Sequence, residues 1–206
     1  MSTYVEILVR RPRGWPWPED SLGLDSVYGE SGWCHECGTP QTGQVGALRL
    51  QKRGLTVAGG WVPNWLYDFY CVENPVVETG RGLGLEFRPI HNPKGEDLGA
   101  SQIIITPSSV PWFDEEELEQ IIAPRHGVGS VRCEVCGCRR WMPMKLANLP
   151  TPNPQVFVER PLVVSSPEHF GDGRQSMRNI LWRRDAADYL LSVGPRDFVV
   201  GAEFEV

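Results

Sequence analysis

The sequence has no long apolar segment and no leader-like N-terminus. No apolar run approaches the roughly 18 residues that a membrane-spanning helix requires. Residues 1–10 do not combine a basic start with an apolar stretch and a small-residue cleavage site. The sequence therefore predicts a cytoplasmic protein without membrane partners. In that reducing compartment its six cysteines favour metal binding over disulfides.

Common catalytic motifs are missing as well. The chain has no P-loop, no dinucleotide-binding Gly-x-Gly-x-x-Gly, no His-Glu-x-x-His and no Gly-x-Ser-x-Gly. The glycine-rich pieces at residues 80–84 and 171–173 are short and typical of turns. The sequence thus predicts a protein that is not an enzyme and has no small-molecule substrate.

Positive charge is also in short supply. The chain carries 20 Lys and Arg residues against 26 Asp and Glu residues, a formal net charge of −6. An acidic chain of this kind is not a bulk binder of polyanions, although a local basic patch can still exist. Apolar residues make up 41% of the 206 residues and include eight tryptophans, enough to build a core.

The chain does contain two Cys-x-x-Cys-Gly motifs, at residues 34–38 and 133–137. Two cysteines in a tight turn can direct both sulfurs at one ion, and the glycine that follows can adopt a positive φ. Four thiolates are a common ligand set for structural Zn²⁺ and leave no open position for a reacting water. We therefore expect one structural Zn²⁺ bound by Cys34, Cys37, Cys133 and Cys136.

The remaining cysteines and one histidine leave alternatives open. Cys138 extends the second motif and is either a spare thiol or a replacement ligand, and His126 is a further substitute ligand. Cys71 lies in a predicted strand and is typical of a small core residue. A redox role is disfavoured because neither motif opens a helix in a thioredoxin-like context.

Periodicity and capping signals predict a mixture of helices and strands. The clearest helix is 114–122, with Asp114 as its N-cap and with Pro124 and Gly127 ending it. Further helices are predicted at 75–79 and 185–192 and from residue 165. Strands are predicted at 4–10, 69–72, 84–90, 102–106, 157–164, 180–182 and 198–206. This mixture predicts an α+β fold.

The two motifs also suggest an internal duplication. Each is followed later by an apolar stretch, a short helical stretch and a strand containing Glu-Phe, at residues 86–87 and 203–204. The sequence therefore predicts a single compact domain over residues 1–206. Its pseudo-repeated halves, 1–107 and 108–206, would be joined by the zinc site.

The two motifs, their spacing and the strand–helix–strand pattern at the C-terminus resemble the double-CXXCG motif proteins of myxobacteria. Some members of that family are encoded as immunity proteins beside Sit-type lipoprotein toxins. The resemblance implies that the same four cysteines are the metal ligands, and it implies no catalytic residues. The sequence departs from the family pattern because neither motif has the proline of Cys-Pro-x-Cys-Gly. Residues 61–70 and 166–172 also do not resemble the myxobacterial members. The function that the resemblance implies is binding and neutralising a toxin.

Two segments carry candidate partner-binding residues. Residues 61–70 are dense in aromatic side chains, a pattern typical either of core packing or of exposed interface anchors. Basic residues around the second motif indicate either a zinc-ribbon nucleic-acid binder or a charged rim neutralised by the acidic segment 114–119. A structural component of a phage or other large assembly is a third reading. The candidate partner-binding residues are Trp61, Trp65, Tyr67, Arg139, Arg140 and Trp141.

Overall fold

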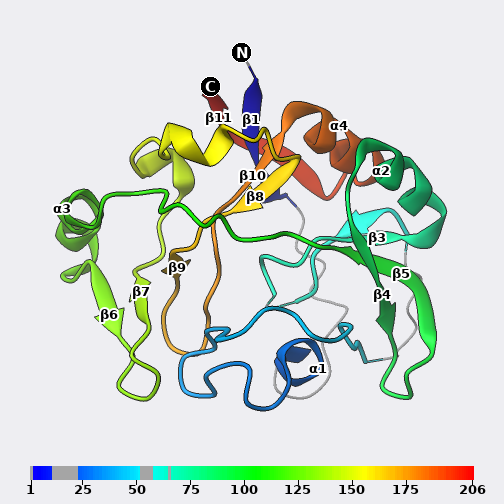
Figure 1. The fold of residues 1–206 in the computed structure, drawn as a ribbon, viewed down its shortest axis with the longest axis horizontal. Coiled ribbons are helices and arrows are strands. Elements are labelled where there is room, and N and C mark those ends of the chain that lie inside the picture. Colours follow the sequence, from blue (N-terminus) through cyan, green and yellow to red (C-terminus); the bar gives the residue numbers. More distant parts are fainter. Residues whose placement is uncertain (1, 11–22, 52–57, 65) are drawn as a thin grey trace.

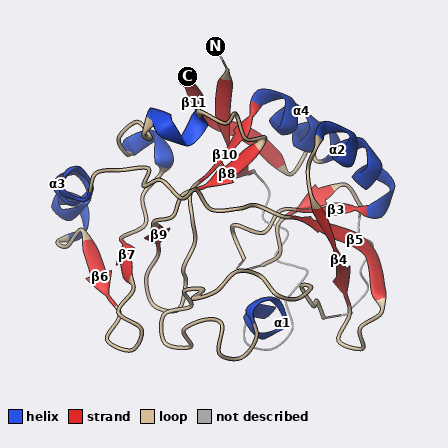
Figure 2. Ribbon diagram, viewed as in Figure 1, coloured by secondary structure: helices blue, strands red, loops and turns tan. Residues whose placement is uncertain are grey.

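The computed structural model describes residues 2–10, 23–51, 58–64 and 66–206 (Figure 1). Helices and strands alternate irregularly along these segments, so the predicted α+β class is confirmed (Figure 2). The strands form two four-stranded sheets and one three-stranded sheet. No helix in the described part of the chain combines the length and apolar character needed to cross a membrane.

The first sheet combines the N-terminal strand with the C-terminal part of the chain. Its strand order is β11-β1-β10-β8, and all neighbours are antiparallel. The strands are β1 (Thr3–Val9), β8 (Val163–Ser165), β10 (Ile180–Arg183) and β11 (Phe198–Glu205). Helix α4 (Arg184–Val193) connects β10 to β11. Since β1 pairs with both, β10 and β11 run in the same direction on either side of it.

The second sheet has the strand order β2-β3-β5-β4, again with antiparallel neighbours. Its strands are β2 (Gly60–Trp61), β3 (Cys71–Glu73), β4 (Phe87–His91) and β5 (Asp97–Ile103). The short helix η2 (Asn74–Val76) and α2 (Val77–Leu83) connect β3 to β4, with β5 lying between those two strands. Both four-stranded sheets thus contain a strand–helix–strand unit split by one antiparallel strand. The predicted pseudo-repeat stays a prediction, because β1 belongs to the sheet of the C-terminal part and residue 107 does not divide the two sheets.

A third sheet, β6-β7-β9, supports the second cysteine motif. Its strands are β6 (Ser130–Arg132), β7 (Arg139–Trp141) and β9 (His169–Phe170). The remaining elements are α1 (Leu24–Tyr28), α3 (Glu115–His126), η3 (Leu146–Asn148) and η4 (Pro154–Phe157). In Figure 1, α3 and β6 lie at one side of the molecule, and α2, β4 and β5 lie at the other.

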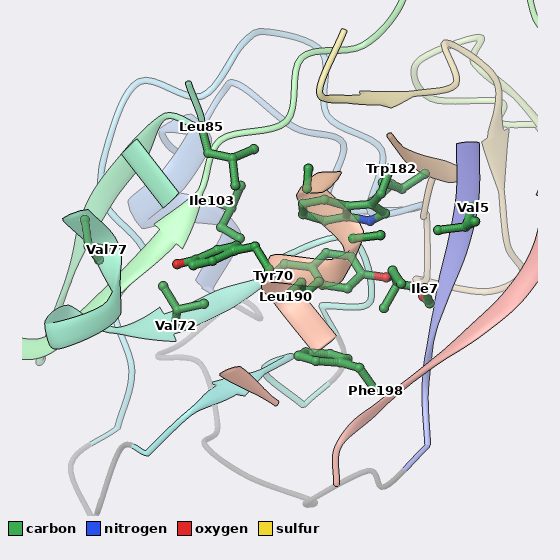
Figure 3. Close-up of a cluster of buried hydrophobic side chains, with 14 residues drawn as sticks. Val5, Ile7, Tyr70, Val72, Val77, Leu85, Ile103, Trp182, Leu190 and Phe198 are labelled. Carbon is green, nitrogen blue, oxygen red and sulfur yellow. Dashed lines mark hydrogen bonds between the residues drawn. The ribbon is translucent and has the colours of Figure 1, made fainter. Parts of the chain in front are cut away.

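The largest core cluster joins the two four-stranded sheets. Figure 3 shows Tyr70 and Trp182 between side chains of β1 and side chains of the second sheet and α2. The Tyr70 hydroxyl donates a hydrogen bond of 2.8 Å to the carbonyl of Ile7, and its ring lies 5.1 Å from that of Trp182. Burial of each large apolar side chain contributes about 1.5–3 kcal/mol. The two four-stranded sheets are therefore held together by apolar packing.

Two helix predictions need correction. Helix α3 begins at the predicted cap, where the Asp114 carboxylate accepts from two backbone N–H groups, but it continues past Pro124 to His126. The helix predicted from residue 165 is absent, and β8 ends there instead. Its place is taken by backbone and side-chain bonds of Ser166, whose N–H donates to the Asn179 carbonyl (2.8 Å). The Ser166 hydroxyl also accepts from the Asn179 N–H (3.2 Å), and such side-chain bonds compete with helix formation.

Candidate metal centre

The two Cys-x-x-Cys-Gly motifs fold into the same turn. In each, the N–H of the first cysteine donates to the carbonyl five residues on, and the glycine N–H donates back to the first cysteine carbonyl. These distances are 2.9 and 2.7 Å in the turn at Cys34, and 2.9 and 2.9 Å in the turn at Cys133. The first turn is closed by a bridge between Trp33 and Pro40, and the second connects β6 to β7. The common geometry directs both sulfurs of each motif to one side.

The glycine after each motif has a left-handed backbone. Gly38 has a φ of 75° and Gly137 a φ of 73°, which L-residues with a side chain adopt at a cost. Gly38 is also tightly packed, since a Cβ atom there would lie 2.2 Å from the carbonyl oxygen of Arg174. A Cβ at Gly137 would meet nothing within 4 Å. The predicted need for glycine is therefore confirmed at both positions, and at the first it has two causes.

The two turns bring the four predicted ligands together. Their sulfur atoms all lie within 4.8 Å of one another, with 3.8 Å between Cys34 and Cys133 and 3.7 Å between Cys37 and Cys136. Tetrahedral coordination with metal–sulfur bonds of about 2.3 Å places sulfurs about 3.8 Å apart. Disulfide bonds are far shorter, and all four residues are free thiols. The four cysteines can therefore hold one metal ion.

The other candidate ligands lie outside this cluster. Cys138 follows the second turn, and its thiol faces the Arg139 carbonyl at 3.6 Å. Cys71 is fully buried in β3 and packs in the apolar cluster around α1, as predicted for a core residue. His126 is exposed at the end of α3. Among the described residues, the group of four metal-binding side chains contains none of these three.

The electrostatics of the cluster favour a bound cation. The backbone N–H groups of Cys136 and Val135 donate to the sulfur of Cys133 and lower its pKa to about 7. Burial and the neighbouring sulfurs instead raise the pKa of Cys136. Several thiols packed this closely cannot all ionise unless a cation compensates their mutual repulsion. A divalent ion would supply that compensation.

Arg140 is the main residue that supports the cluster from outside. Its side chain is 7% exposed, and one guanidinium nitrogen donates to the carbonyls of Cys37 (3.1 Å), Gly173 (2.9 Å) and Gln175 (2.8 Å). It therefore ties β7 to the first cysteine turn and to the loop beyond β9. Four thiolates around a divalent ion carry a net charge of −2, and a buried guanidinium beside them offsets part of it.

A chain of hydrogen bonds leads from the cluster to β9 and beyond. Cys37 Sγ contacts the Thr39 hydroxyl (3.2 Å), which contacts the Ser176 hydroxyl (3.0 Å), which contacts His169 Nδ1 (3.1 Å). His169 Nε2 accepts from Arg178 at 3.0 Å, since a guanidinium only donates. Burial, Arg178 and Arg140 lower the pKa of His169 to about 3, so the ring is neutral and its Nδ1 carries the proton. Sequence patterns did not predict this series of hydrogen bonds, because it joins residues 37 and 39 to residues 169–178, far along the sequence.

The six candidate partner-binding residues are not one surface. Trp61 is 2% exposed and Trp141 is 3% exposed, so neither is an exposed anchor, and Arg140 is buried as described above. Arg139 pairs with Glu115 of α3 and stacks over Trp141 at 5.4 Å. Tyr67 is 46% exposed, and Trp65 lies outside the described residues. Trp61 packs in the apolar cluster around α1, and Trp141 packs in the cluster that contains Leu118 and Ile122 of α3.

Tyr67 lines a groove that sequence reasoning did not anticipate. The groove has a volume of about 710 Å³ and lies beside β1, where β10 no longer covers that strand. Tyr67 and Leu8, which is 41% exposed, contribute apolar surface to it, and so do Met144 and Met177. Exposed apolar side chains gathered in a groove are typical of a binding surface.

The sequence matches no protein-family model and no curated protein.

Proposed function

We propose that the four-cysteine centre binds one structural Zn²⁺. The proposal is supported by an all-sulfur ligand set, by sulfur–sulfur distances of 3.7 and 3.8 Å, and by the buried Arg140 beside the cluster. Zn²⁺ accepts four thiolates in tetrahedral geometry, and full ligation leaves no position for a substrate or a reacting water. The ion would join the turn after residue 33 to the turn between β6 and β7, so that binding energy becomes folding energy.

The metal content of variants tests this proposal. We expect one zinc per chain in protein purified without chelator, measured by mass spectrometry of the metal. Cys34→Ser and Cys133→Ser should each lower the zinc content and the thermal stability. Cys138→Ser is the matched control and should keep the metal. Wild-type protein without zinc, or an unchanged content in both ligand variants, would contradict the proposal.

We infer that the protein acts by binding another protein, and that it is an immunity protein, or antitoxin, that masks a toxin. The observation that carries the inference is the groove of about 710 Å³ with Tyr67 and Leu8 exposed in it. Tyrosine is enriched at interface hot spots, and methionines such as Met144 and Met177 adapt to a partner's shape. The resemblance to double-CXXCG immunity proteins and the net charge of −6 support a toxin partner that is basic.

The nucleic-acid alternative has less support at the second motif. The Arg140 guanidinium donates hydrogen bonds to three backbone carbonyls, and Arg139 is paired with Glu115. Arg132 donates to the Gly137 carbonyl at 2.8 Å. A basic surface that contacts phosphates needs cations free to meet them, and these three already have partners within the chain.

Capture from nuclease-treated native lysate distinguishes these functions. We expect the tagged wild-type chain to retain one stoichiometric protein, which Tyr67→Ala should release. Val158→Ala is the matched control, because Val158 is 76% exposed and lies outside the groove. Retention of nucleic acid from an untreated lysate, with no protein retained after nuclease treatment, would favour the zinc-ribbon alternative. Retention of a large multi-protein assembly would favour a structural component. Either result would refute the immunity role.

A further inference from the structure

A second cavity, of about 400 Å³, lies where the two four-stranded sheets approach each other. Its wall combines residues 40–44, which follow the first cysteine turn, with residues 104–107, which follow β5. The beginning of β10, at Ile180, and the end of β8, at Ser165, close it from the other sheet. The volume is typical of a pocket for a small molecule. The groove beside Tyr67 is a separate space, although Arg178 and Ile180 line both.

The cavity wall contains one carboxylate, Asp68, and two guanidinium groups, Arg88 and Arg178. Asp68 and Arg178 both line it, and among the described residues neither forms an ion pair. Burial raises the pKa of Asp68 to about 6, and the positive charge of Arg178 acts in the opposite direction and lowers that pKa. Arg178 donates from one nitrogen to His169, and its Nε is buried without a partner. Both side chains are half-buried at the cavity wall, and neither forms an ion pair among the described residues, so both groups have capacity for a ligand.

The rest of the wall is polar at one side and apolar at the other. Gln102 is 1% exposed, and its Nε2 donates to Gln44 (3.1 Å) while its Oε1 has no partner. Arg88 is already occupied by the carbonyl of Gly46 at 2.6 Å, so it stiffens the wall and is not the free cation. The apolar part comes from Phe69, Ile104, Ile105 and Ile180.

We propose that this cavity binds a small zwitterion of the amino-acid type, with its ammonium on Asp68 and its carboxylate on Arg178. A ligand with both charges pairs with both groups at once, whereas a simple amine or a simple acid would leave one of them without a partner. A guanidinium binds a carboxylate in a two-pronged geometry, which fixes the ligand's orientation. The apolar part of the wall then receives the ligand's side chain.

The hydrogen-bond chain connects this cavity to the metal centre. With a free thiol at Cys37, the thiol donates to the Thr39 hydroxyl, which donates to the Ser176 hydroxyl. A metal-bound Cys37 is a thiolate and can only accept, so both bonds would reverse, with Thr39 donating to Cys37 and Ser176 donating to Thr39. His169 Nδ1 donates to Ser176, and Arg178 donates to His169 Nε2. Every donor in this arrangement points toward the metal, and such chains strengthen cooperatively. Metal loading thus holds Arg178 in position for the ligand's carboxylate.

Thermal-shift and calorimetric titration of the zinc-loaded full chain test the proposal, with the twenty L-amino acids as probes at millimolar concentration. We expect at least one to raise the melting temperature and to bind in the titration. The corresponding amine without a carboxylate, and the corresponding acid without an amine, should each bind at least about tenfold more weakly. No stabilisation by any of the twenty would overturn the proposal. Equal binding of the amine or the acid alone would overturn it too.

Variants of the two charged groups locate the site. Asp68→Asn and Arg178→Gln should each weaken binding at least about tenfold. Asp172→Asn is the control, because Asp172 is exposed and lies outside the cavity wall. If Arg178→Gln fails to fold, Arg178→Lys keeps the positive charge. This variant should bind the amino acid more weakly than wild type does, but more tightly than wild type binds the corresponding amine. Unchanged affinity in Asp68→Asn, or binding only of peptides and proteins, would refute the assignment.

Discussion

Replacing Gly38 with alanine tests how closely the first cysteine turn packs against the loop that contains Arg174. Gly38 and Gly137 occupy equivalent places in their turns, with φ values of 75° and 73°. Alanine at either position must adopt a left-handed backbone, which costs about 1–2 kcal/mol. Gly137→Ala therefore measures the backbone term alone, because a Cβ there would meet nothing within 4 Å.

Gly38→Ala carries a second cost. Its Cβ would lie 2.2 Å from the carbonyl oxygen of Arg174, and a backbone atom cannot rotate away as a side chain can. The loop must move, and that loop also supplies the Gln175 carbonyl that binds Arg140. Overpacking of this kind costs about 1–3 kcal/mol. The free energy of unfolding should therefore fall by about 2–5 kcal/mol in Gly38→Ala and by about 1–2 kcal/mol in Gly137→Ala.

Urea unfolding of the zinc-loaded variants measures this difference. The midpoint should shift further for Gly38→Ala, while both variants bind one zinc per chain at saturating metal. Losses that agree within about 0.5 kcal/mol would refute the packing argument, because the close approach to the Arg174 carbonyl would then have no energetic consequence.

Three further perturbations have defined expectations. Arg140→Met should lower the free energy of unfolding by about 3 kcal/mol, because three carbonyls lose their donor. Arg139→Gln should lower it by less than about 1 kcal/mol, because it removes only a surface ion pair with Glu115. Equal losses in urea unfolding would contradict this. Burial raises the pKa of Asp68 from 3.8 to about 6, so ionising Asp68 destabilises the folded state, and this cost is complete above pH 6. Asp68→Asn removes the cost and should therefore raise the free energy of unfolding more at pH 8 than at pH 5. A gain that does not depend on pH would argue against burial as the cause. Asp114→Ala should cost about 1 kcal/mol by removing the cap of α3, and unchanged hydrogen-exchange protection in the first turn of α3 would speak against that role.

Local signals predicted the parts of this molecule that local chemistry determines. The Cys-x-x-Cys-Gly turns depend on five consecutive residues and on the affinity of thiolates for metal, so both the turns and their meeting point followed from the sequence. The cap at Asp114 and the helix predicted at 185–192, which is α4, likewise depend on one segment each. Strands β1 and β11 followed from their β-branched composition.

Long-range partners were not predictable in this way. Arg140 stands between a surface arginine and a tryptophan in β7, and nothing nearby in sequence indicates that its acceptors are at residues 37, 173 and 175. Core packing was the favoured interpretation of residues 61–70, yet Trp61 was also a candidate surface anchor, because aromatic density does not reveal which face of a two-residue strand is covered. The place of β1 between β10 and β11 depends on pairing across almost the whole chain.

The two ends of the chain lie in one antiparallel pair, and this has a consequence for how the protein folds. The N–H of Ser2 donates to the Val206 carbonyl at 2.8 Å, and the N–H of Val206 donates to the Ser2 carbonyl at 3.0 Å. A short linker could therefore close the chain into a ring, which could be reopened between β5 and α3. In that permuted order β1 would directly follow β11, just as β5 follows β4. Every strand pair of the first sheet would then be close in sequence, and because folding slows as contacts become less local, the permuted chain should fold faster than the natural one around an unchanged metal centre.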